Sequence, residues 1–300
     1  MYTAVIINPN ARGVTKKILL IIKRYFANNG SVIFIPRTAK EATRIAAKVA
    51  ARHGSRIIVV GGDGTINAVV NGIARSSAQL GIIPAGTAND LALAVGISGN
   101  IRQALDIIQQ GKTRAIDLIK VGRWHYATGG GIGLPARVAL FANLVRKTFP
   151  LSKKTGSLIY LLGVLYHLLK GSYRPDLVEI SKNGRYEKKE VLFLTISNQP
   201  KIGKRFCTTP GARNDDRVYD ICLTENPKNW IRRIWIILKT IRGRHTGEKW
   251  VSQWRGNTLR LVSDKPVTFM ADGELRPPAQ KFLIKLVPSA LQLIVPEEKN

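Results

Sequence analysis

The run from Arg56 to Val60 constrains the fold of this chain more than any other part of the sequence. After its arginine it contains only isoleucine and valine, without the polar alternation of a half-exposed strand. Such strands are typical of a parallel sheet that helices cover on both faces. Further β-rich runs at 3–7, 31–35 and 80–83 alternate with helical patterns. The alternation predicts an N-terminal α/β domain with a parallel sheet.

Helix signals stand between these strands. Helical periodicity runs from about 15 to 28, and another helix is predicted to end near Ala74. Thr38 and Glu41 have the spacing of a capping box, which predicts a helix that begins there and stops at Gly54. Each helix would connect two neighbouring parallel strands.

Two glycine-containing loops follow consecutive strands of the predicted sheet. The first is Gly-Gly-Asp-Gly-Thr-Ile-Asn at 61–67, and the second is Pro-Ala-Gly-Thr-Ala-Asn-Asp at 84–90. Folds of this class bind ligands beyond the carboxyl ends of parallel strands. Glycine allows the backbone to approach a phosphate and to adopt unusual dihedral angles, and a helix N-terminus directs N–H groups at the same place. The pair of loops indicates nucleotide binding, although an ordinary turn capped by Asn or Asp explains either loop alone.

The C-terminal half has a different pattern. From about Lys120 it consists of strand-like runs, with one helical stretch from about 138 to 171. Asn183-Gly184 is a hairpin turn signal. We therefore predict a mostly β, sandwich-like C-terminal domain. Its candidate strands are 178–181, 190–197, 220–224, 258–263, 267–271 and 282–287, followed by 291–295.

The charge and cysteine content narrow the range of functions. With 47 Lys and Arg against 19 Asp and Glu, the net charge is +28, which favours polyanionic partners. No nucleic-acid-binding motif is visible, so we expect no specific nucleic acid partner. Cys207 and Cys222 have no partner pattern and are interpreted as reduced core thiols of a cytosolic protein. No export signal or membrane-spanning run is visible, and no signal indicates an oligomeric state.

The two loops, spelled GGDGTIN and GIIPAGTANDLA, resemble the catalytic domain of diacylglycerol kinases and the related bacterial lipid kinases and sphingosine kinases. The resemblance covers the whole chain and implies ATP and Mg²⁺ as cofactors. It implies a nucleotide-binding domain at 1–118, to which 289–300 returns, and a lipid-substrate domain at 119–288. The implied ATP contacts are Asn8, Thr38, Gly61, Gly62, Asp63, Gly64, Thr65, Asn67, Gly86 and Thr87. Asp63 and Asp90 would belong to a water-linked Mg²⁺ network, which explains an aspartate beside phosphate.

The resemblance also implies a structural Mg²⁺ site. Asp216 takes the place of the family's metal-binding aspartate, and Arg213 and Val218 would contribute backbone oxygens. The family's glycine after that aspartate is Arg217 here, which weakens the match. A turn with solvated carboxylates is the alternative interpretation of this segment.

Asp272-Gly273-Glu274 matches the family's D-G-E motif. Phosphoryl transfer to a hydroxyl requires a group that accepts its proton, and one of these two carboxylates is the predicted base. The sequence does not distinguish Asp272 from Glu274, and a D-G turn between strands is the alternative. A second departure from the family is Pro135, which replaces an aspartate that meets the lipid head group in the sphingosine kinase relatives.

Asn226 is a predicted N-cap, with Pro227 at the first helical position of an amphipathic helix that ends near Gly243. Its two tryptophans beside cationic residues suit a membrane interface, while packing on its own β domain is the alternative. The apolar arc contains Trp230, Ile231, Ile234, Trp235, Ile237, Leu238 and Ile241.

The sequence therefore predicts an ATP-dependent lipid kinase that phosphorylates a lipid hydroxyl, such as that of diacylglycerol. We expect it to be cytoplasmic and peripheral to the anionic inner face of the membrane. Two other functions stay open. One is a small-molecule kinase of the NAD kinase type, and the other is a non-catalytic module that binds polyanions or membranes.

Overall fold

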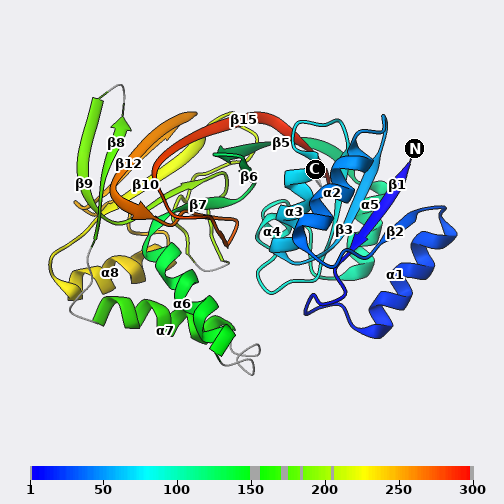
Figure 1. The fold of residues 1–300 in the computed structure, drawn as a ribbon, viewed down its shortest axis with the longest axis horizontal. Coiled ribbons are helices and arrows are strands. Elements are labelled where there is room, and N and C mark those ends of the chain that lie inside the picture. Colours follow the sequence, from blue (N-terminus) through cyan, green and yellow to red (C-terminus); the bar gives the residue numbers. More distant parts are fainter. Residues whose placement is uncertain (1, 149–155, 170–174, 183–184, 204–205, 298–300) are drawn as a thin grey trace. The chain divides into compact units, whose positions relative to one another are not determined.

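The computed structural model describes residues 2–148, 156–169, 175–182, 185–203 and 206–297 (Figure 1). The predicted turn at 183–184 and the cations at 204–205 lie outside the described residues. The chain divides into two compact units. The first unit contains residues 1–128, 214–217 and 286–300, and the second contains 129–213 and 218–285.

The first unit is an α/β domain with a parallel sheet, as predicted. Its strands β1 (Thr3–Ile7), β2 (Val32–Phe34), β3 (Arg56–Gly61) and β4 (Gln79–Pro84) pair in parallel in the order β4-β3-β1-β2. The helices are α1 (Lys16–Asn28), α2 (Ala39–Ala50), α3 (Asp63–Ile73), α4 (Asp90–Ala94) and α5 (Ile101–Gln110). The isoleucines and valines of β3 are all fully buried, which explains their unbroken apolar run.

The second unit is mostly β. Its strands β7 (Gly129–Gly133), β8 (Asp176–Lys182), β9 (Arg185–Ser197), β10 (Tyr219–Glu225), β11 (Val251–Gly256), β12 (Thr258–Val267), β13 (Met270–Ala271) and β14 (Glu274–Leu275) pair antiparallel. Its helices are α6 (Leu134–Thr148), α7 (Gly156–Leu169) and α8 (Trp230–Ile241). The single helical stretch predicted at 138–171 is thus two helices within the described residues.

The last strand, β15 (Ala279–Val295), belongs to both units. Its first part pairs antiparallel with β12, and Gln292 and Leu293 pair in parallel with β4. The sequence predicted two separate strands here, 282–287 and 291–295, on either side of Pro288. The structure instead continues the strand through this position, with Ser289 at a positive φ of 51°.

Asp117 ties three distant segments of the first unit together. It lies on β5 (Lys112–Val121), which pairs with β6 (Trp124–Tyr126), and it is 1% exposed. Its Oδ2 accepts from the backbone N–H of Arg217 and its Oδ1 from that of Ser289, both at 2.7 Å. Its own N–H donates to the carbonyl of Asn214 at 2.7 Å. These bonds attach the short segment 214–217 to β5, so that it belongs to the first unit.

Two further expectations concern the cysteines and the membrane. Cys222 is buried, which raises the pKa of its thiol to about 12, whereas Cys207 is only half-buried. Both are free, as predicted, but only Cys222 belongs to the core.

In the part of the chain that the structure describes, no helix is both long enough and apolar enough to cross a membrane.

Candidate active site

The carboxyl edge of the parallel sheet gathers the predicted nucleotide loops. The strand order β4-β3-β1-β2 means that the connections after β1 and β3 run in opposite directions along the sheet. In open α/β sheets, ligands bind beyond the carboxyl ends of two neighbouring strands whose connections leave in opposite directions. The loops after β1, β3 and β4 all begin at this edge, because these strands are parallel and in register.

The N-terminus of α3 differs from those of α1, α2 and α5, whereas α4, like α3, is preceded by a residue that makes no side-chain cap. Thr15, Thr38 and Asn100 accept hydrogen bonds from backbone N–H groups in the first turns of α1, α2 and α5. Gly62 precedes α3 and makes no side-chain cap. The first N–H groups of a helix have no partner within the helix and lie at the positive end of its dipole. This helix end is therefore suited to an anion.

Gly62 and Gly86 bring the first and second loops together. A Cβ added to Gly62 would lie 2.9 Å from the Cα of Gly86, and one added to Gly86 would lie 2.5 Å from the Cα of Gly62. At Gly61 an added Cβ would lie 2.7 Å from the Cβ of Thr65. Gly62 has an ordinary φ of −96°. Close approach of the two backbones therefore requires glycine there, rather than the unusual dihedral angle expected from the sequence.

Asp63 joins the first loop to the second. Its Oδ2 accepts from the backbone N–H of Asn89 at 2.9 Å, and its Oδ1 accepts from that of Asp90 at 2.7 Å. The carboxylate thus lies at the N-terminal end of α4, where negative charge is favourable. A carboxylate has about four acceptor sites, so Asp63 also has the capacity to accept from water bound to a metal.

Asn89 shapes the second loop, and the sequence analysis did not single it out. Its φ of 55° lies in the left-handed region, which asparagine tolerates better than most residues. Its Oδ1 accepts from the N–H of Gly86 at 2.8 Å, and its Nδ2 donates to the carbonyl of Gly86 at 3.2 Å. An asparagine directly before a helix start is the sequence signal that identifies this position.

The loop after β1 packs on the other two loops. Nδ2 of Asn8 donates to Oγ1 of Thr65 at 2.9 Å, so the predicted site residue that follows β1 contacts one on α3. The N–H of Gly13 donates to the carbonyl of Ala85 at 2.8 Å. A Cβ added to Gly13 would lie 3.1 Å from the Cα of Ala85. Gly13 is thus a candidate site residue that the sequence analysis missed, although a glycine soon after a strand end was visible.

Thr38 and Asn67 have partners outside these loops. Oγ1 of Thr38 accepts from the N–H of Glu41 at 3.1 Å, so its capping role is present. Oε2 of Glu41 accepts from the N–H of Arg37 rather than that of Thr38, so the capping box is incomplete. Nδ2 of Asn67 donates to the carbonyl of His125 in β6 at 3.2 Å. The ATP contacts of Thr38 and Asn67 stay predictions, as do those of half-buried Gly64 and exposed Thr87.

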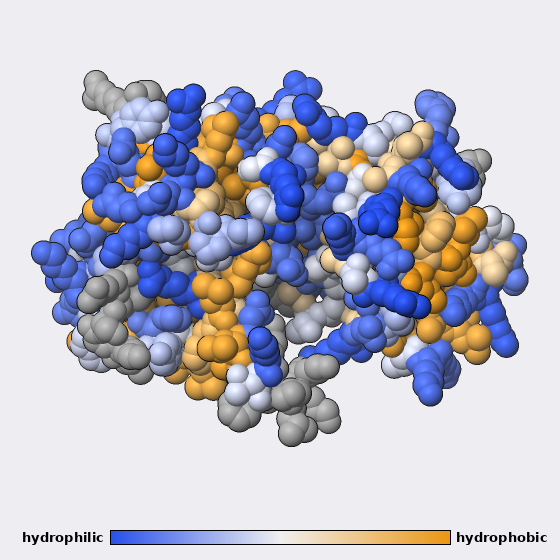
Figure 2. Space-filling model, in the orientation of Figure 1, coloured by the Kyte–Doolittle hydropathy of each residue, from blue (hydrophilic) through white to orange (hydrophobic). Residues whose placement is uncertain are grey.

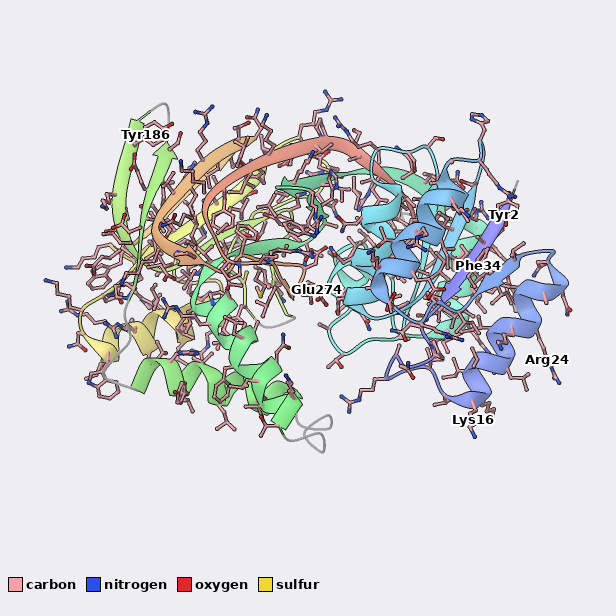
Figure 3. The ribbon with its side chains drawn as sticks, in the orientation of Figure 1. Tyr2, Lys16, Arg24, Phe34, Tyr186 and Glu274 are labelled. Carbon is pink, nitrogen blue, oxygen red and sulfur yellow. The ribbon has the colours of Figure 1, made fainter. Side chains whose placement is uncertain are left out.

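The D-G-E motif forms a tight hairpin in the second unit, where Figure 3 labels Glu274. Asp272 and Gly273 have φ values of 48° and 77°, the signs expected of a type I′ turn between β13 and β14. The N–H of Asp272 donates to the carbonyl of Gly129 at 3.0 Å. The turn that the sequence left as an alternative is therefore present. It uses the backbone, so it does not compete with a chemical role for the two carboxylates.

Arg276 is a further charged residue beside this hairpin, and the sequence analysis missed it. Its N–H donates to the carbonyl of Phe269 at 2.8 Å. Burial lowers the pKa of its guanidinium, and the negative charges of Asp272 and Glu274 oppose that shift. The guanidinium is therefore close enough to interact with both carboxylates, and Asp272 is the more buried of the two.

The predicted metal segment lies where the chain passes between the units. Asp216 belongs to the 214–217 segment of the first unit, whereas Arg213 and Val218 belong to the second. Oδ2 of the neighbouring Asp215 is 4.0 Å from Arg114. Among the described residues, no cluster of three or more His, Cys, Asp or Glu could hold a metal ion. The predicted set is of a different kind, one carboxylate with two carbonyl oxygens, and it stays a prediction.

Comparison with known proteins identifies the family. The family model for the diacylglycerol kinase catalytic domain matches residues 3–121. The model for the YegS C-terminal NAD kinase beta sandwich-like domain matches residues 131–295, which is more than half of the chain. This chain belongs to the diacylglycerol kinase and YegS family. The family resemblance of the two glycine-containing loops is thus confirmed.

Relatives in this family match over nearly their whole length. The diacylglycerol kinase of Bacillus subtilis is 29% identical over 281 residues, which are 90% of this chain and 88% of the relative. The diacylglycerol kinase of Staphylococcus carnosus is 25% identical over 280 residues, covering 90% and 87%. A crystal structure of a diacylglycerol kinase from Bacillus anthracis has a TM-score of 0.76 at 20% identity, covering 99% and 97% of the two chains. That structural similarity shows the shared fold.

The two departures from the family pattern fit the local backbone. Pro135 lies in the first turn of α6, where a missing N–H leaves no intrahelical hydrogen bond unmade. Arg217 has a φ of 63°, the left-handed conformation that favours the family's glycine. The hydrogen bond from its N–H to Asp117 holds this conformation. The backbone at this position is therefore one that glycine would adopt, although the side chain differs.

Proposed function

We propose that this member of the diacylglycerol kinase and YegS family is an ATP- and Mg²⁺-dependent lipid kinase. It transfers the γ-phosphate of ATP to a lipid hydroxyl, such as that of diacylglycerol. The observation that carries the proposal is the N-terminus of α3, which has no side-chain cap and lies directly against the second glycine-containing loop. The names of the Bacillus subtilis and Staphylococcus carnosus relatives support the acceptor.

The first turn of α3 would bind the phosphates of ATP. The N–H of Thr65 donates to the carbonyl of Gly62 at 2.9 Å, whereas the N–H groups of Asp63 and Gly64 precede it at the positive end of the helix, which favours anions. Gly62 and Gly86 present no side chain that would block approach. The hydroxyl of Thr65, held by Asn8, adds a polar group beside them. Phosphoryl transfer depends mostly on positioning and charge neutralisation, which a rigid loop pair of this kind can provide.

The oxygen ligands that Mg²⁺ prefers are present in this part of the first unit. Asp63 and Asp90 would hold the ion through water, while the two backbone bonds to Asp63 keep its carboxylate in place. Bound Mg²⁺ would offset the negative charge of the phosphates. Asp216, with the carbonyls of Arg213 and Val218, would hold a separate structural ion.

Asp272 or Glu274 would accept the proton of the attacking lipid hydroxyl. The rigid I′ turn and the bond from Asp272 to Gly129 restrict the motion of this hairpin. The positive charge of Arg276 lies close enough to interact with both carboxylates. The variants Asp272→Asn and Glu274→Gln separate the two candidates, because only loss of the true base lowers kcat without changing the binding of ATP.

Transfer of labelled γ-phosphate from ATP to diacylglycerol in detergent micelles tests the proposal. The wild-type protein should produce labelled phosphatidic acid only when Mg²⁺ is present. Asp63→Asn preserves size and an acceptor oxygen but removes the charge, so kcat should fall at least about 100-fold. Asp106→Asn, an exposed carboxylate on α5 of the same unit, is the matched control and should leave kcat unchanged.

The outcome of the same assay separates the alternatives. A folded wild-type protein that labels no lipid, or an Asp63→Asn variant with the kcat of the wild type, contradicts the proposal. Addition of NAD to the acceptor panel tests the small-molecule alternative. Label that enters NAD and not lipid would favour a kinase of that type.

A further inference from the structure

Most of the apolar side of helix α8 faces away from the second unit, and the side that packs on this unit includes polar residues. The side chains that face inward are Arg233, Ile236, Ile237 and Thr240, two of which are polar. Nε of Arg233 donates to the carbonyl of Pro227 at 2.8 Å, and Oγ1 of Thr240 donates to the carbonyl of Ile236 at 2.8 Å. The inward face is therefore stable because its polar groups have partners.

The opposite side of α8 is apolar and exposed to solvent. At 100° per residue, its five large apolar side chains fall within an arc of about 140°. Their exposed fractions are 51% for Trp230, 58% for Ile231, 55% for Trp235, 45% for Leu238 and 39% for Ile241. We call these five residues the α8 face. Packing of the helix therefore does not use the α8 face. Of the predicted apolar arc, only Ile237 and, in part, Ile234 pack on the second unit, as the sequence-based alternative expected.

Cations surround the α8 face. Lys228, Arg232, Arg242 and Arg244 are all exposed. Nζ of Lys239 lies 5.1 Å from the ring centre of Trp235, and the same side chain pairs with Glu248. The guanidinium of Arg232 lies 5.1 Å from the ring centre of Trp250. Tryptophan beside lysine and arginine is the composition of helices that lie in the interface of an anionic bilayer.

The neighbouring helices add apolar surface. Val164 and Leu168 of α7 share a core cluster with Ile237 of α8, so α7 and α8 are packed together. Figure 2 shows apolar side chains gathered over α6 and α7 on the visible face. Of the 17 large apolar side chains that are exposed among the described residues, ten lie on these three helices. The five beyond the α8 face are Leu140, Leu144, Leu162, Leu165 and Tyr166.

We propose that the α8 face docks the protein on an anionic lipid bilayer. A lipid surface can accept tryptophan rings, aliphatic side chains and surrounding cations together, and it can contact more than one helix at a time. The charge of the rim selects an anionic surface, because each cation near such a leaflet strengthens binding about fivefold. The docking surface is separate from the proposed phosphate-binding loops, which belong to the first unit.

Sedimentation with vesicles of phosphatidylglycerol and phosphatidylcholine tests the docking surface without nucleotide. The wild-type chain should bind vesicles that contain phosphatidylglycerol, and binding should weaken steeply as NaCl rises from about 0.1 to 0.5 M. Trp235→Glu should weaken binding at least about tenfold, because it removes an inserted ring and adds a repelled charge. The assay contains no ATP, so it does not depend on whether the chain is a kinase.

Tyr186→Glu is the matched control for this substitution. Tyr186 is 52% exposed, close to the 55% of Trp235, and lies on β9 of the same unit, away from α8 (Figure 3). It should bind vesicles like the wild type. Equal weakening by both variants would overturn the proposal, because the loss would then be an effect of charge alone.

Two other results would also overturn it. One is unchanged vesicle binding by Trp235→Glu in a protein whose circular dichroism matches the wild type. The other is a wild-type dimer that Trp235→Glu converts to a monomer in analytical ultracentrifugation while vesicle binding persists. In that case the α8 face would be a contact between two copies of the chain.

Discussion

Helices α5 and α8 begin in the same way and face their units in opposite ways. Each is preceded by an asparagine whose side chain caps the first turn: Asn100 accepts from the N–H groups of Arg102 and Gln103, and Asn229 accepts from the N–H of Ile231. The buried residues of α5 are Ala104, Leu105 and Ile108, and its charged and amide side chains are mostly exposed. On α8, two polar side chains are buried and two tryptophans are exposed.

The difference teaches that amphipathicity and burial are separate properties. A periodic pattern shows that a helix has an apolar side, but any apolar surface nearby can attract either side if the polar groups there find partners. In α5 the apolar side packs on the sheet, where Ile108 lies close to Gly81. In α8 the side that contains Arg233 packs instead, because Arg233 bonds to the carbonyls of Pro227 and Lys228.

Truncation of buried and exposed isoleucines should give the largest contrast. Ile236→Ala on α8 and Ile108→Ala on α5 should each lower the free energy of unfolding by about 2–4 kcal/mol, because each leaves a cavity. Ile231→Ala, on the exposed side of α8, should lower it by less than about 0.5 kcal/mol in the absence of lipid. Urea unfolding followed by circular dichroism measures all three. A loss for Ile231→Ala as large as that for Ile236→Ala would show that α8 packs the other way round.

Removal of the buried cation should have an intermediate effect. Arg233→Ala leaves the carbonyls of Pro227 and Lys228 without their donor and removes a packed side chain, so we expect a loss of about 1–3 kcal/mol. Arg232→Ala, one residue earlier and exposed, should change the free energy of unfolding by less than about 0.5 kcal/mol. Thermal unfolding monitored by tryptophan fluorescence suits this pair. Similar values for both variants would contradict the inward orientation of Arg233.

The two caps should show the smallest effect and no contrast. Asn100→Ala and Asn229→Ala should each lower the free energy of unfolding by about 1 kcal/mol, because each substitution removes the side-chain oxygen that accepts a hydrogen bond from the first turn of its helix. Calorimetry of the two variants under identical conditions makes the comparison. A clear difference between them would mean that the helix ends depend on their surroundings and not only on local chemistry.

The start of α8 shows how local signals compete. The sequence predicted Asn226 as the cap, with Pro227 at the first helical position. The helix begins at Trp230 with Asn229 as its cap, so that prediction was wrong. The N–H of Asn226 donates to the carbonyl of Glu190 in β9, which ties this residue to the sheet. Asn226 and Asn229 have similar capping propensities. What distinguishes Asn226 is its backbone hydrogen bond to a strand that lies far away in the sequence.

The sequence predicted the two loops of the candidate site but not the contacts between them. Both glycine-containing loops could be placed at strand ends, because apolar runs and glycine clusters are local patterns. The bonds from Asp63 to Asn89 and Asp90 connect residues that lie 26 and 27 positions apart. The contact between Gly62 and Gly86 joins residues 24 positions apart. Such contacts depend on how adjacent strands align, which no short window of sequence contains.

By itself, the sequence determined the family of this protein, the alternation of strands and helices in its first half and the presence of an amphipathic α8. These follow from residue types and spacings that act over a few positions. The tertiary structure alone decided that Asp63 caps α4, that β15 continues through Pro288 and that the tryptophans of α8 face solvent. Each of these depends on partners supplied by distant parts of the chain, because burial and hydrogen bonding are satisfied over the whole fold and not within one segment.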